Sequence, residues 1–274
     1  MVGVKLMNPT SGNIFSSASS YDAYMGRWSR LVAPQFVNWL GIAPGSTWLD
    51  VGAGTGVLTQ AILDEAFPAQ VVGIDTSADY IDAARQQVVH DRAEFRVGDA
   101  GEISESSFFD AAVAGLVLNF VPSPEQAVTS MVKAVGAGGV VAAYVWDYTG
   151  QMQMVRNFWD AAAAVDPSSA EMEARQRYAI CNPDALRSLF HGADLQAVVT
   201  SAIDVPTRFK DFDDYWLPIQ GAQGSIAKYF HGIGDETRNA IRDQLQRQLP
   251  TEADGSIPLM ARAWAVKGIK ADPG

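Results

Sequence analysis

The sequence predicts an α/β fold in which helices cover both faces of a mostly parallel β-sheet. Short apolar runs of strand length alternate with longer segments of helical periodicity from residue 47 onward. The longest uninterrupted apolar run, residues 140–146, has the length and composition of a buried strand. With 48% apolar and 19% charged residues, the 274-residue chain is long enough and apolar enough for one large globular domain. Alternating β and α units of this kind are typical of a parallel sheet between two layers of helices.

The expected elements follow one another in the order that such a fold requires. An amphipathic helix over residues 30–40 has its apolar side chains at helical spacing and ends before Gly41 and Pro44. Strands are expected at residues 47–51, 70–74, 93–97, 110–115, 139–145, 195–205 and 257–266. Helices are expected at residues 57–66, 78–89, 124–135, 152–165 and 182–190. Ser77 and Ser123 stand where their hydroxyls can cap the helices that follow.

The pattern divides the chain into an arm, a core and an insertion. Residues 1–29 include a stretch rich in Ser, Asn and Gly and are expected to form a partly mobile N-terminal arm that can fold over a ligand. Residues 30–274 are expected to form one domain. Within it, residues 210–250 have helical character between the last two strands, and we expect them to form a cap near the active face.

Composition excludes several classes of function. The chain has 20 Lys and Arg against 31 Asp and Glu, a net charge of −11, so its field repels nucleic-acid phosphates. One Cys and three scattered His can form neither a disulfide framework nor a Cys/His zinc site, and no metal is expected. No apolar run approaches the length of a membrane span, and the first residues do not form a secretory signal. We therefore expect a cytoplasmic protein, a monomer or homodimer, that acts on a small molecule.

A glycine-rich loop follows the first expected strand, with the sequence DVGAGTG over residues 50–56. Turns at the carboxyl end of a strand in an open parallel sheet are where ligands bind, and glycines let the backbone approach a ligand closely. The dinucleotide pattern G-x-G-x-x-G fails because Val57 occupies the third glycine position. A pyrophosphate close to Asp50 would also be repelled, by about 4 kcal/mol at 4 Å in an effective dielectric of 20. The loop therefore favours a ligand that carries an ammonium or sulfonium group.

The loop resembles motif I of the class I S-adenosylmethionine (SAM)-dependent methyltransferases, in the small-molecule branch that includes the methyltransferase type 11 and quinone-biosynthesis enzymes. The likeness continues through VVGIDTS at residues 71–77, FRVGDA at residues 95–100 and the segment from residue 108 to residue 122. It implies a Rossmann-like sheet of seven strands and binding of SAM, with S-adenosylhomocysteine as product. The cofactor-binding residues that it implies are Asp50, Gly52, Ala53, Gly54, Gly56, Asp75, Thr76, Asp99, Ala100 and Leu116.

The resemblance also implies particular roles for these positions. Asp75 would accept hydrogen bonds from both ribose hydroxyls. Asp99 would accept from the exocyclic amine of adenine, and the backbone N–H of Ala100 would donate to a ring nitrogen. Leu116 would contact the methionine moiety. Many relatives have two histidines where this chain has Asn119 and Phe120, so no histidine base is expected there.

Further candidates lie outside the shared motifs. Arg27 is expected to bind the carboxylate of SAM through its guanidinium fork, and Tyr24 to border the methyl group or the acceptor. Asp147 is the candidate general base. The candidate acceptor-binding residues are Asn119, Trp146, Tyr148, Tyr215 and Trp216. Each group also has a structural reading: packing of the first helix with an exposed Arg27, strand-end packing and a helix cap for residues 146–148, and core packing for Tyr215 and Trp216 in the expected cap.

The sequence thus predicts methyl transfer from SAM to a small molecule by in-line displacement, with an O, N or C nucleophile. A SAM-binding regulator or scaffold without turnover is the alternative from a different class, because the binding motifs cannot separate it from an enzyme. A nicotinamide-dependent oxidoreductase is less well supported, owing to Asp50 and the missing third glycine.

Overall fold

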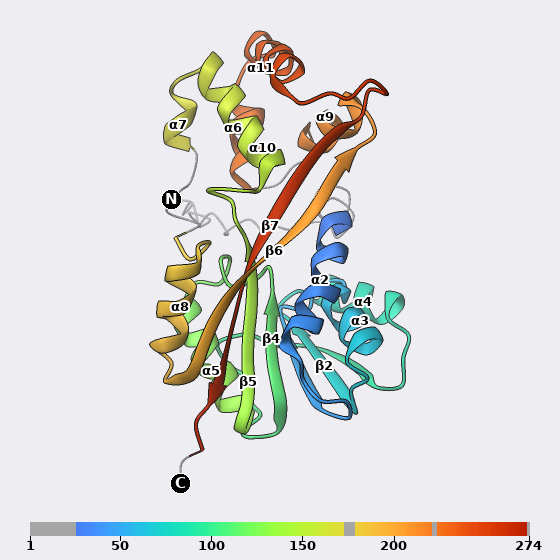
Figure 1. The fold of residues 1–274 in the computed structure, drawn as a ribbon, viewed down its shortest axis with the longest axis vertical. Coiled ribbons are helices and arrows are strands. Elements are labelled where there is room, and N and C mark those ends of the chain that lie inside the picture. The colour runs from blue at the N-terminus through green and yellow to red at the C-terminus, as the bar shows by residue number, and fades with distance from the viewer. Residues whose placement is uncertain (1–25, 173–178, 221–223, 273–274) are drawn as a thin grey trace, which may run out of the picture.

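The computed structural model of the protein describes residues 26–172, 179–220 and 224–272, and within them seven strands form one sheet (Figure 1). The strands are β1 (Thr47–Val51), β2 (Gln70–Asp75), β3 (Ala93–Val97), β4 (Phe109–Gly115), β5 (Val135–Trp146), β6 (Leu195–Phe209) and β7 (Ile257–Lys270). Their order in the sheet is β3-β2-β1-β4-β5-β7-β6. The first five strands are parallel, and β7 runs antiparallel between β5 and β6. The expected Rossmann-like, mostly parallel sheet is confirmed.

The helices begin and end close to the expected positions. They are α2 (Arg27–Leu40), α3 (Val57–Glu65), α4 (Ala78–Gln87), α5 (Pro124–Ala134), α6 (Gln153–Val165), α7 (Ser169–Met172), α8 (Pro183–His191), α9 (Phe212–Gln220), α10 (Gly224–Gly232) and α11 (Asp235–Gln248). The expected caps are confirmed, since the hydroxyls of Ser77 and Ser123 accept the backbone N–H of Tyr80 and Gln126. The prediction for the first helix was wrong at its start. Because the ring of Trp28 packs on Phe209, the helix includes residues 27–29, which the sequence assigned to the arm.

Alternate side chains of the strands build two hydrophobic cores, one on each face of the sheet. Trp48 points into the core that α2, α3 and α4 cover. Leu49 and Val51 point into the opposite core, which α5 and α8 cover. Figure 1 shows α5 and α8 on one side of the sheet and α2, α3 and α4 on the other. The helices cover the two faces of the sheet. The edge at the carboxyl ends of β1, β2 and β4 is formed by loops.

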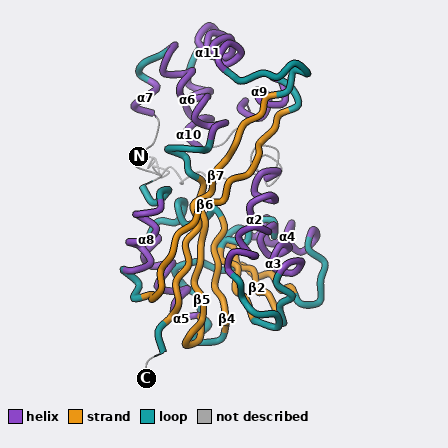
Figure 2. Tube along the Cα trace, viewed as in Figure 1, coloured by secondary structure: helices purple, strands orange, loops and turns teal. Residues whose placement is uncertain are grey.

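The last two strands extend beyond the rest of the sheet. Trp146, the final residue of β5, pairs with Ala263, whereas β6 and β7 remain paired as far as Phe209 and Ile257. Helices α6, α7, α9, α10 and α11 gather around this extension, and we call the whole the distal lobe (Figure 2). The hydroxyl of Tyr215 donates to the carbonyl of Met154 at 2.9 Å and so ties α9 to α6.

The distal lobe includes α9, α10 and α11, which lie between β6 and β7 in the chain. In Figure 1 the arrowhead of β4 points toward this lobe, so its helices stand beyond the carboxyl ends of the parallel strands. This is the edge at which open parallel sheets bind ligands. Closure of residues 210–250 over a ligand stays a prediction.

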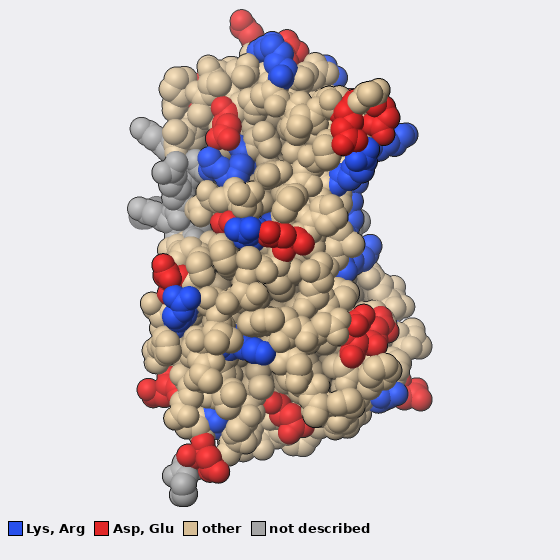
Figure 3. Space-filling model, viewed as in Figure 1, with Lys and Arg blue, Asp and Glu red and all other residues tan. Residues whose placement is uncertain are grey.

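Charged side chains on the surface stand in small groups of mixed sign on the face shown in Figure 3. On the extended pair of strands β6 and β7, Arg262 pairs with Asp204 at 2.6 Å. Arg208 of β6 pairs with Glu252 at 2.6 Å and Asp254 at 3.1 Å, both in the segment before β7. Among the described helices, none combines the length and apolar character that crossing a bilayer requires.

Candidate functional site

The glycine loop joins the end of β1 to the start of α3. Gly52, Gly54 and Gly56 have φ angles of 73°, 54° and 87°, all in the left-handed region that residues with a Cβ rarely adopt. The backbone N–H groups of Gly52 and Ala53 donate to the carbonyl of Ile74 at 2.8 and 2.9 Å. The loop is therefore fastened to the end of β2.

The three glycines have different surroundings. A Cβ on Gly52 would lie 2.5 Å from a methyl of Val117, and one on Gly56 would lie 2.7 Å from Val88. A Cβ on Gly54 would meet no atom of the described chain within 4 Å. Gly52 and Gly56 are thus required by packing, whereas Gly54 faces open space where a ligand can approach the backbone.

Two carboxylates flank this loop. Asp50, on β1, is 1% exposed, and its Oδ2 accepts the hydroxyl of Thr59 at 2.7 Å. Its Oδ1 is buried and has no hydrogen-bond partner within the described part of the chain. Burial raises the pKa of Asp50 from 3.8 to about 7; the bonds from Thr59 oppose this shift, and the nearby charge of Asp75 adds to it. A buried carboxylate with a free oxygen is prepared for a cationic partner.

Asp75 ends β2 on the other side of the loop. Its Oδ2 accepts the backbone N–H of Gly54 at 3.0 Å, and its Oδ1 accepts the backbone N–H of Ser77 at 2.9 Å. Burial raises the pKa of Asp75, and these backbone hydrogen bonds act against that increase. Thr76, between Asp75 and Ser77 in the sequence, is exposed in the turn before α4. The carboxylate is therefore held rigidly beside Gly54.

Asp99 and Ala100 follow the end of β3 at the same edge. Strand β3 lies next to β2, with Val97 opposite Asp75. Asp99 is exposed, and its Oδ1 accepts the backbone N–H of Gly101 at 2.7 Å, while Ala100 is partly buried against the core beneath α5. The sheet thus brings the ends of β1, β2 and β3 together in the order that the motifs require.

Leu116 shapes the other side of the loop, just after β4. It has a φ angle of 61°, which is rare for a residue other than glycine, and its N–H donates to the carbonyl of Tyr144 at 2.8 Å. The next residue, Val117, packs on Gly52. Asn119 has a buried Nδ2 that lacks a partner among the residues described. Strained backbone and unsatisfied polar atoms of this kind cluster at functional sites.

Asp147 follows β5 and is 6% exposed. Its Oδ2 accepts the backbone N–H of Gln151 at 2.9 Å, and a Cβ on Gly150 would lie 2.5 Å from the same oxygen. The carboxylate therefore stabilises the turn that leads into α6. Trp146 beside it is 1% exposed, and Tyr148 is partly buried between the two cores.

The candidate residues of the distal lobe lie in its core. Tyr215 is fully buried, and Trp216 is 6% exposed. The ring of Trp216 stacks on Phe212 and meets Phe230 edge to face, with centroids 6.1 and 5.6 Å apart. The geometry shows packing for both residues, and contact with an acceptor stays a prediction.

Arg27 joins α2 to the distal lobe. Its Nη1 lies 2.9 Å from Oδ1 of Asp214 on α9. Its guanidinium carbon lies 4.2 Å from the ring centroid of Trp28 and 4.8 Å from that of Phe209. The side chain is 34% exposed. Tyr24, expected nearby, lies outside the described residues.

Replacing Arg27 separates its two possible roles. Arg27 is predicted to bind the cofactor carboxylate, and on that prediction Arg27→Ala should weaken SAM binding at least tenfold. Asp214→Asn is the matched control, since it removes the ion pair but keeps the guanidinium. Calorimetry should give Asp214→Asn a dissociation constant within about twofold of the wild type. Equal weakening in both variants would show that Arg27 acts only by attaching α9.

The sequence did not single out Thr59 or Val117, although both contact the loop. A Thr in the first turn of a helix usually faces solvent or bonds to its own helix backbone, so its position alone does not reveal a bond to a strand. The residue type of Val117 does not indicate a contact with the glycine loop, because a valine after a strand is common in any sheet. Its role follows from the backbone of Leu116, which only the three-dimensional structure shows.

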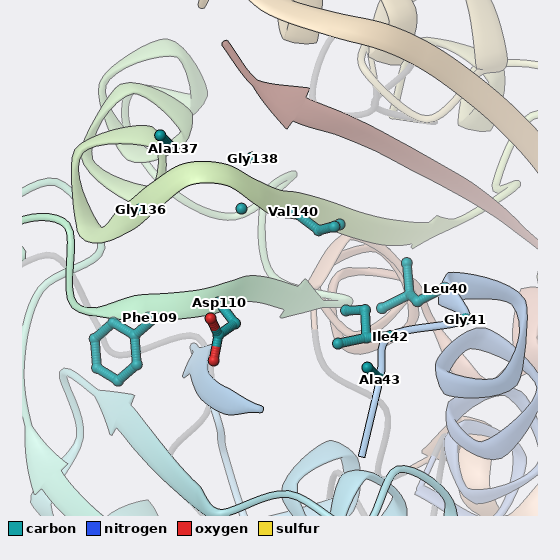
Figure 4. Close-up of a pocket in the computed structure, with 11 residues that line it drawn as sticks. Leu40, Gly41, Ile42, Ala43, Phe109, Asp110, Gly136, Ala137, Gly138 and Val140 are labelled. Atoms are coloured by element: carbon teal, nitrogen blue, oxygen red, sulfur yellow. The ribbon is translucent and has the colours of Figure 1, made fainter. Parts of the chain in front are cut away.

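A pocket at the opposite edge of the sheet does not belong to this site (Figure 4). The turn after α2 and the starting ends of β4 and β5 line it, whereas the glycine loop lies at the carboxyl ends. The carboxylate of Asp110 in this pocket already accepts the backbone N–H and the hydroxyl of Thr47, at 2.8 and 2.9 Å.

Comparison with known proteins agrees with a glycine loop and strand-end carboxylates that resemble those of methyltransferases. Residues 49–143 match the family model of a methyltransferase domain. The mitochondrial ubiquinone biosynthesis O-methyltransferase of Candida albicans is 31% identical over 98 residues, which are 34% of this chain and 30% of that protein. The 2-phytyl-1,4-naphtoquinone methyltransferase of Synechocystis is 29% identical over 155 residues, which are 54% of this chain and 65% of that protein. The chain thus matches less than two thirds of either relative.

The fold has counterparts among solved structures. Phosphoethanolamine N-methyltransferase 2 of Haemonchus contortus, in complex with S-adenosyl-L-methionine, superposes with a TM-score of 0.55. The match has 13% sequence identity and covers 96% of this chain and 59% of that chain. This likeness concerns the fold alone.

Proposed function

We propose that the chain transfers a methyl group from SAM to a small-molecule acceptor, because residues 49–143 match the family model of a methyltransferase domain. One observation carries the proposal. The loop with three left-handed glycines lies between the buried carboxylate of Asp50 and the partly buried carboxylate of Asp75, and Oδ1 of Asp50 is left for a cation. A dinucleotide would instead bring a pyrophosphate to this loop, where the two carboxylates would repel it.

The residues present fit SAM. The open space over Gly54 admits a ligand next to the backbone, and Asp75 stands beside it to accept the ribose hydroxyls. Asp99 and the N–H of Ala100 would hold the adenine edge, with Thr76 next to the ribose. Leu116 would border the methionine end, and Nδ2 of Asn119, which has no partner among the described residues, would border the acceptor.

SAM supplies a methyl group on a sulfonium, and the chain's own residues supply position. The acceptor atom, the methyl carbon and the sulfur would lie in line, an arrangement that can contribute about 7 to 11 kcal/mol to catalysis. Asp147 is the proposed base for an acidic acceptor such as a phenol. Since Oδ2 of Asp147 is hydrogen-bonded within its turn, we propose that most of the rate comes from positioning.

The acceptor that we propose is an aromatic or quinone-like small molecule. The two curated relatives named above are methyltransferases of ubiquinone biosynthesis and of a phytyl naphthoquinone. In this chain Trp146 ends β5 and Tyr148 follows it, on either side of Asp147 in the sequence. Tyr24, Tyr215 and Trp216 are further proposed neighbours of the acceptor. Flat apolar walls of this kind suit an aromatic ring.

Ligand-induced stabilisation tests the cofactor. SAM at about 100 times its dissociation constant should stabilise the fold by about 2.7 kcal/mol and raise the melting temperature by on the order of 5 °C. NAD and NADP should leave the melting temperature unchanged. A shift with NAD or NADP and none with SAM would contradict the proposal.

Turnover of labelled SAM over a panel of phenols, quinone precursors and amines tests the reaction. Formation of S-adenosylhomocysteine that depends on an acceptor would support an enzyme. Tight binding of SAM without turnover on the whole panel would favour a regulator or scaffold instead.

A further inference from the structure

A buried hydroxyl–carboxylate pair connects the strand before the glycine loop to the helix after it. The hydroxyl of Thr59 donates to Oδ2 of Asp50 at 2.7 Å, and the two residues are 0% and 1% exposed. The backbone N–H of Thr59 also interacts with this carboxylate. Residues 50 and 59 thus bracket the whole loop.

This pair determines where the second oxygen of Asp50 points. A carboxylate is planar, so fixing Oδ2 against Thr59 also sets the direction of Oδ1. That oxygen is buried without a hydrogen-bond partner in the described residues. Leaving a buried acceptor unsatisfied is costly, and a fixed, unsatisfied one is typical of a group kept for a ligand.

Few other charges act on Asp50. On β2, Asp75 is the neighbouring carboxylate. On α3, Asp64 and Glu65 are exposed in the last turn. On β4, the positions opposite β1 are Ala111, Ala112 and Val113. The buried side chains of α2 are Trp28, Ser29, Val32, Ala33, Phe36, Val37 and Leu40, none of which is titratable. A cationic group on a ligand would therefore balance the charge of the Asp50 carboxylate.

We propose that Thr59 is a positioning residue that orients Asp50, so that Oδ1 of Asp50 receives the cationic methionine end of the cofactor. The inference rests on the proposed function. It predicts that Thr59 affects ligands that carry the charged amino-acid end and not neutral adenosine derivatives. It also predicts a pH dependence, because losing the hydroxyl donor raises the pKa of Asp50 further.

Calorimetry on three proteins tests this role: the wild type, Thr59→Val and Thr59→Ser. The probes are SAM and 5′-methylthioadenosine, which lacks the amino-acid end, each at pH 6 and pH 8. We expect wild-type binding of SAM to be tighter at pH 8, where Asp50 is ionised. Thr59→Val should weaken SAM binding at least tenfold at pH 8, while Thr59→Ser restores it to within about threefold. All three proteins should bind 5′-methylthioadenosine alike.

Other outcomes would overturn the inference in distinguishable ways. Unchanged SAM binding by Thr59→Val would remove the positioning role. Equal loss of both probes would reduce Thr59 to a structural residue of the loop. If Thr59→Val does not fold, Thr59→Ala, which keeps no donor and adds no bulk, carries the same expectations. A folded wild type that binds neither probe would defeat the proposed function itself, and the inference with it.

Discussion

Replacing Asp50 with Asn should stabilise the ligand-free protein at pH 8 and at the same time weaken SAM binding ten- to hundredfold. The stability gain has a definite sign. Because burial raises the pKa of Asp50 from 3.8 to about 7, the folded protein keeps a proton that the unfolded chain loses between those values. Wild-type stability therefore falls as the pH rises from about 4 to about 7, and the full cost of the buried charge is present at pH 8.

The magnitude follows from the same values. A shift from 3.8 to about 7 corresponds to about 4 kcal/mol, which is an upper bound because the buried amide of Asn needs a hydrogen-bond partner for its N–H₂. The loss of affinity reflects a charge-assisted hydrogen bond, worth about 1.5 to 3 kcal/mol. Thermal unfolding from pH 5 to pH 9 and calorimetry with SAM measure the two effects.

Asp64→Asn is the control for this change. It removes one carboxylate charge from α3, but that carboxylate is exposed and accepts the side-chain amide of Gln60 at 2.9 Å. Neither stability nor SAM affinity should change measurably. An Asp50→Asn protein that melts like the wild type at pH 8, or binds SAM as tightly, would contradict the placement of a buried charge at the site.

Gly52→Ala should lower the melting temperature by on the order of 10 °C. The new side chain would adopt a left-handed conformation at a cost of about 1 to 2 kcal/mol. Its Cβ would also lie 2.5 Å from Val117, an overlap that costs typically about 1 to 3 kcal/mol more. Differential scanning calorimetry measures the change.

Gly54→Ala is the matched variant, because it has the same left-handed backbone and no atom of the described chain within 4 Å of the added Cβ. It should lose only the conformational cost, and so melt several degrees above Gly52→Ala. It should nevertheless weaken SAM binding at least tenfold, since the added methyl projects into the ligand's space. Equal melting temperatures for the two variants would refute the tight contact between Val117 and the loop.

The sequence predicted the parts of the fold that local patterns encode. The expected strand over residues 47–51 coincides with β1, and the Ser77 and Ser123 caps lie where expected, because strand periodicity and capping involve residues close in the chain. The carboxylates at the strand ends were predictable for the same reason. Each follows an apolar run, and the carboxyl ends of parallel strands meet at one edge.

Contacts between distant segments were not predictable in this way. The antiparallel insertion of β7 between β5 and β6, and the extension of that pair into the distal lobe, depend on pairings across the chain that no local period records. The ion pair of Arg27 with Asp214 likewise joins α2 to α9, residues far apart in sequence.

The sequence by itself determined the alternation of strands and helices, the glycine loop and the acidic residues around it, since each is written in neighbouring residues. Only the tertiary structure decided what those residues can do. It buries Asp50 against Thr59 with one oxygen free, places the strained Leu116 so that Val117 closes on Gly52, and ties Asp147 into a turn. The physical reason is that burial and hydrogen-bond satisfaction depend on which faces meet when the chain packs, and these properties govern the charge and direction of a side chain.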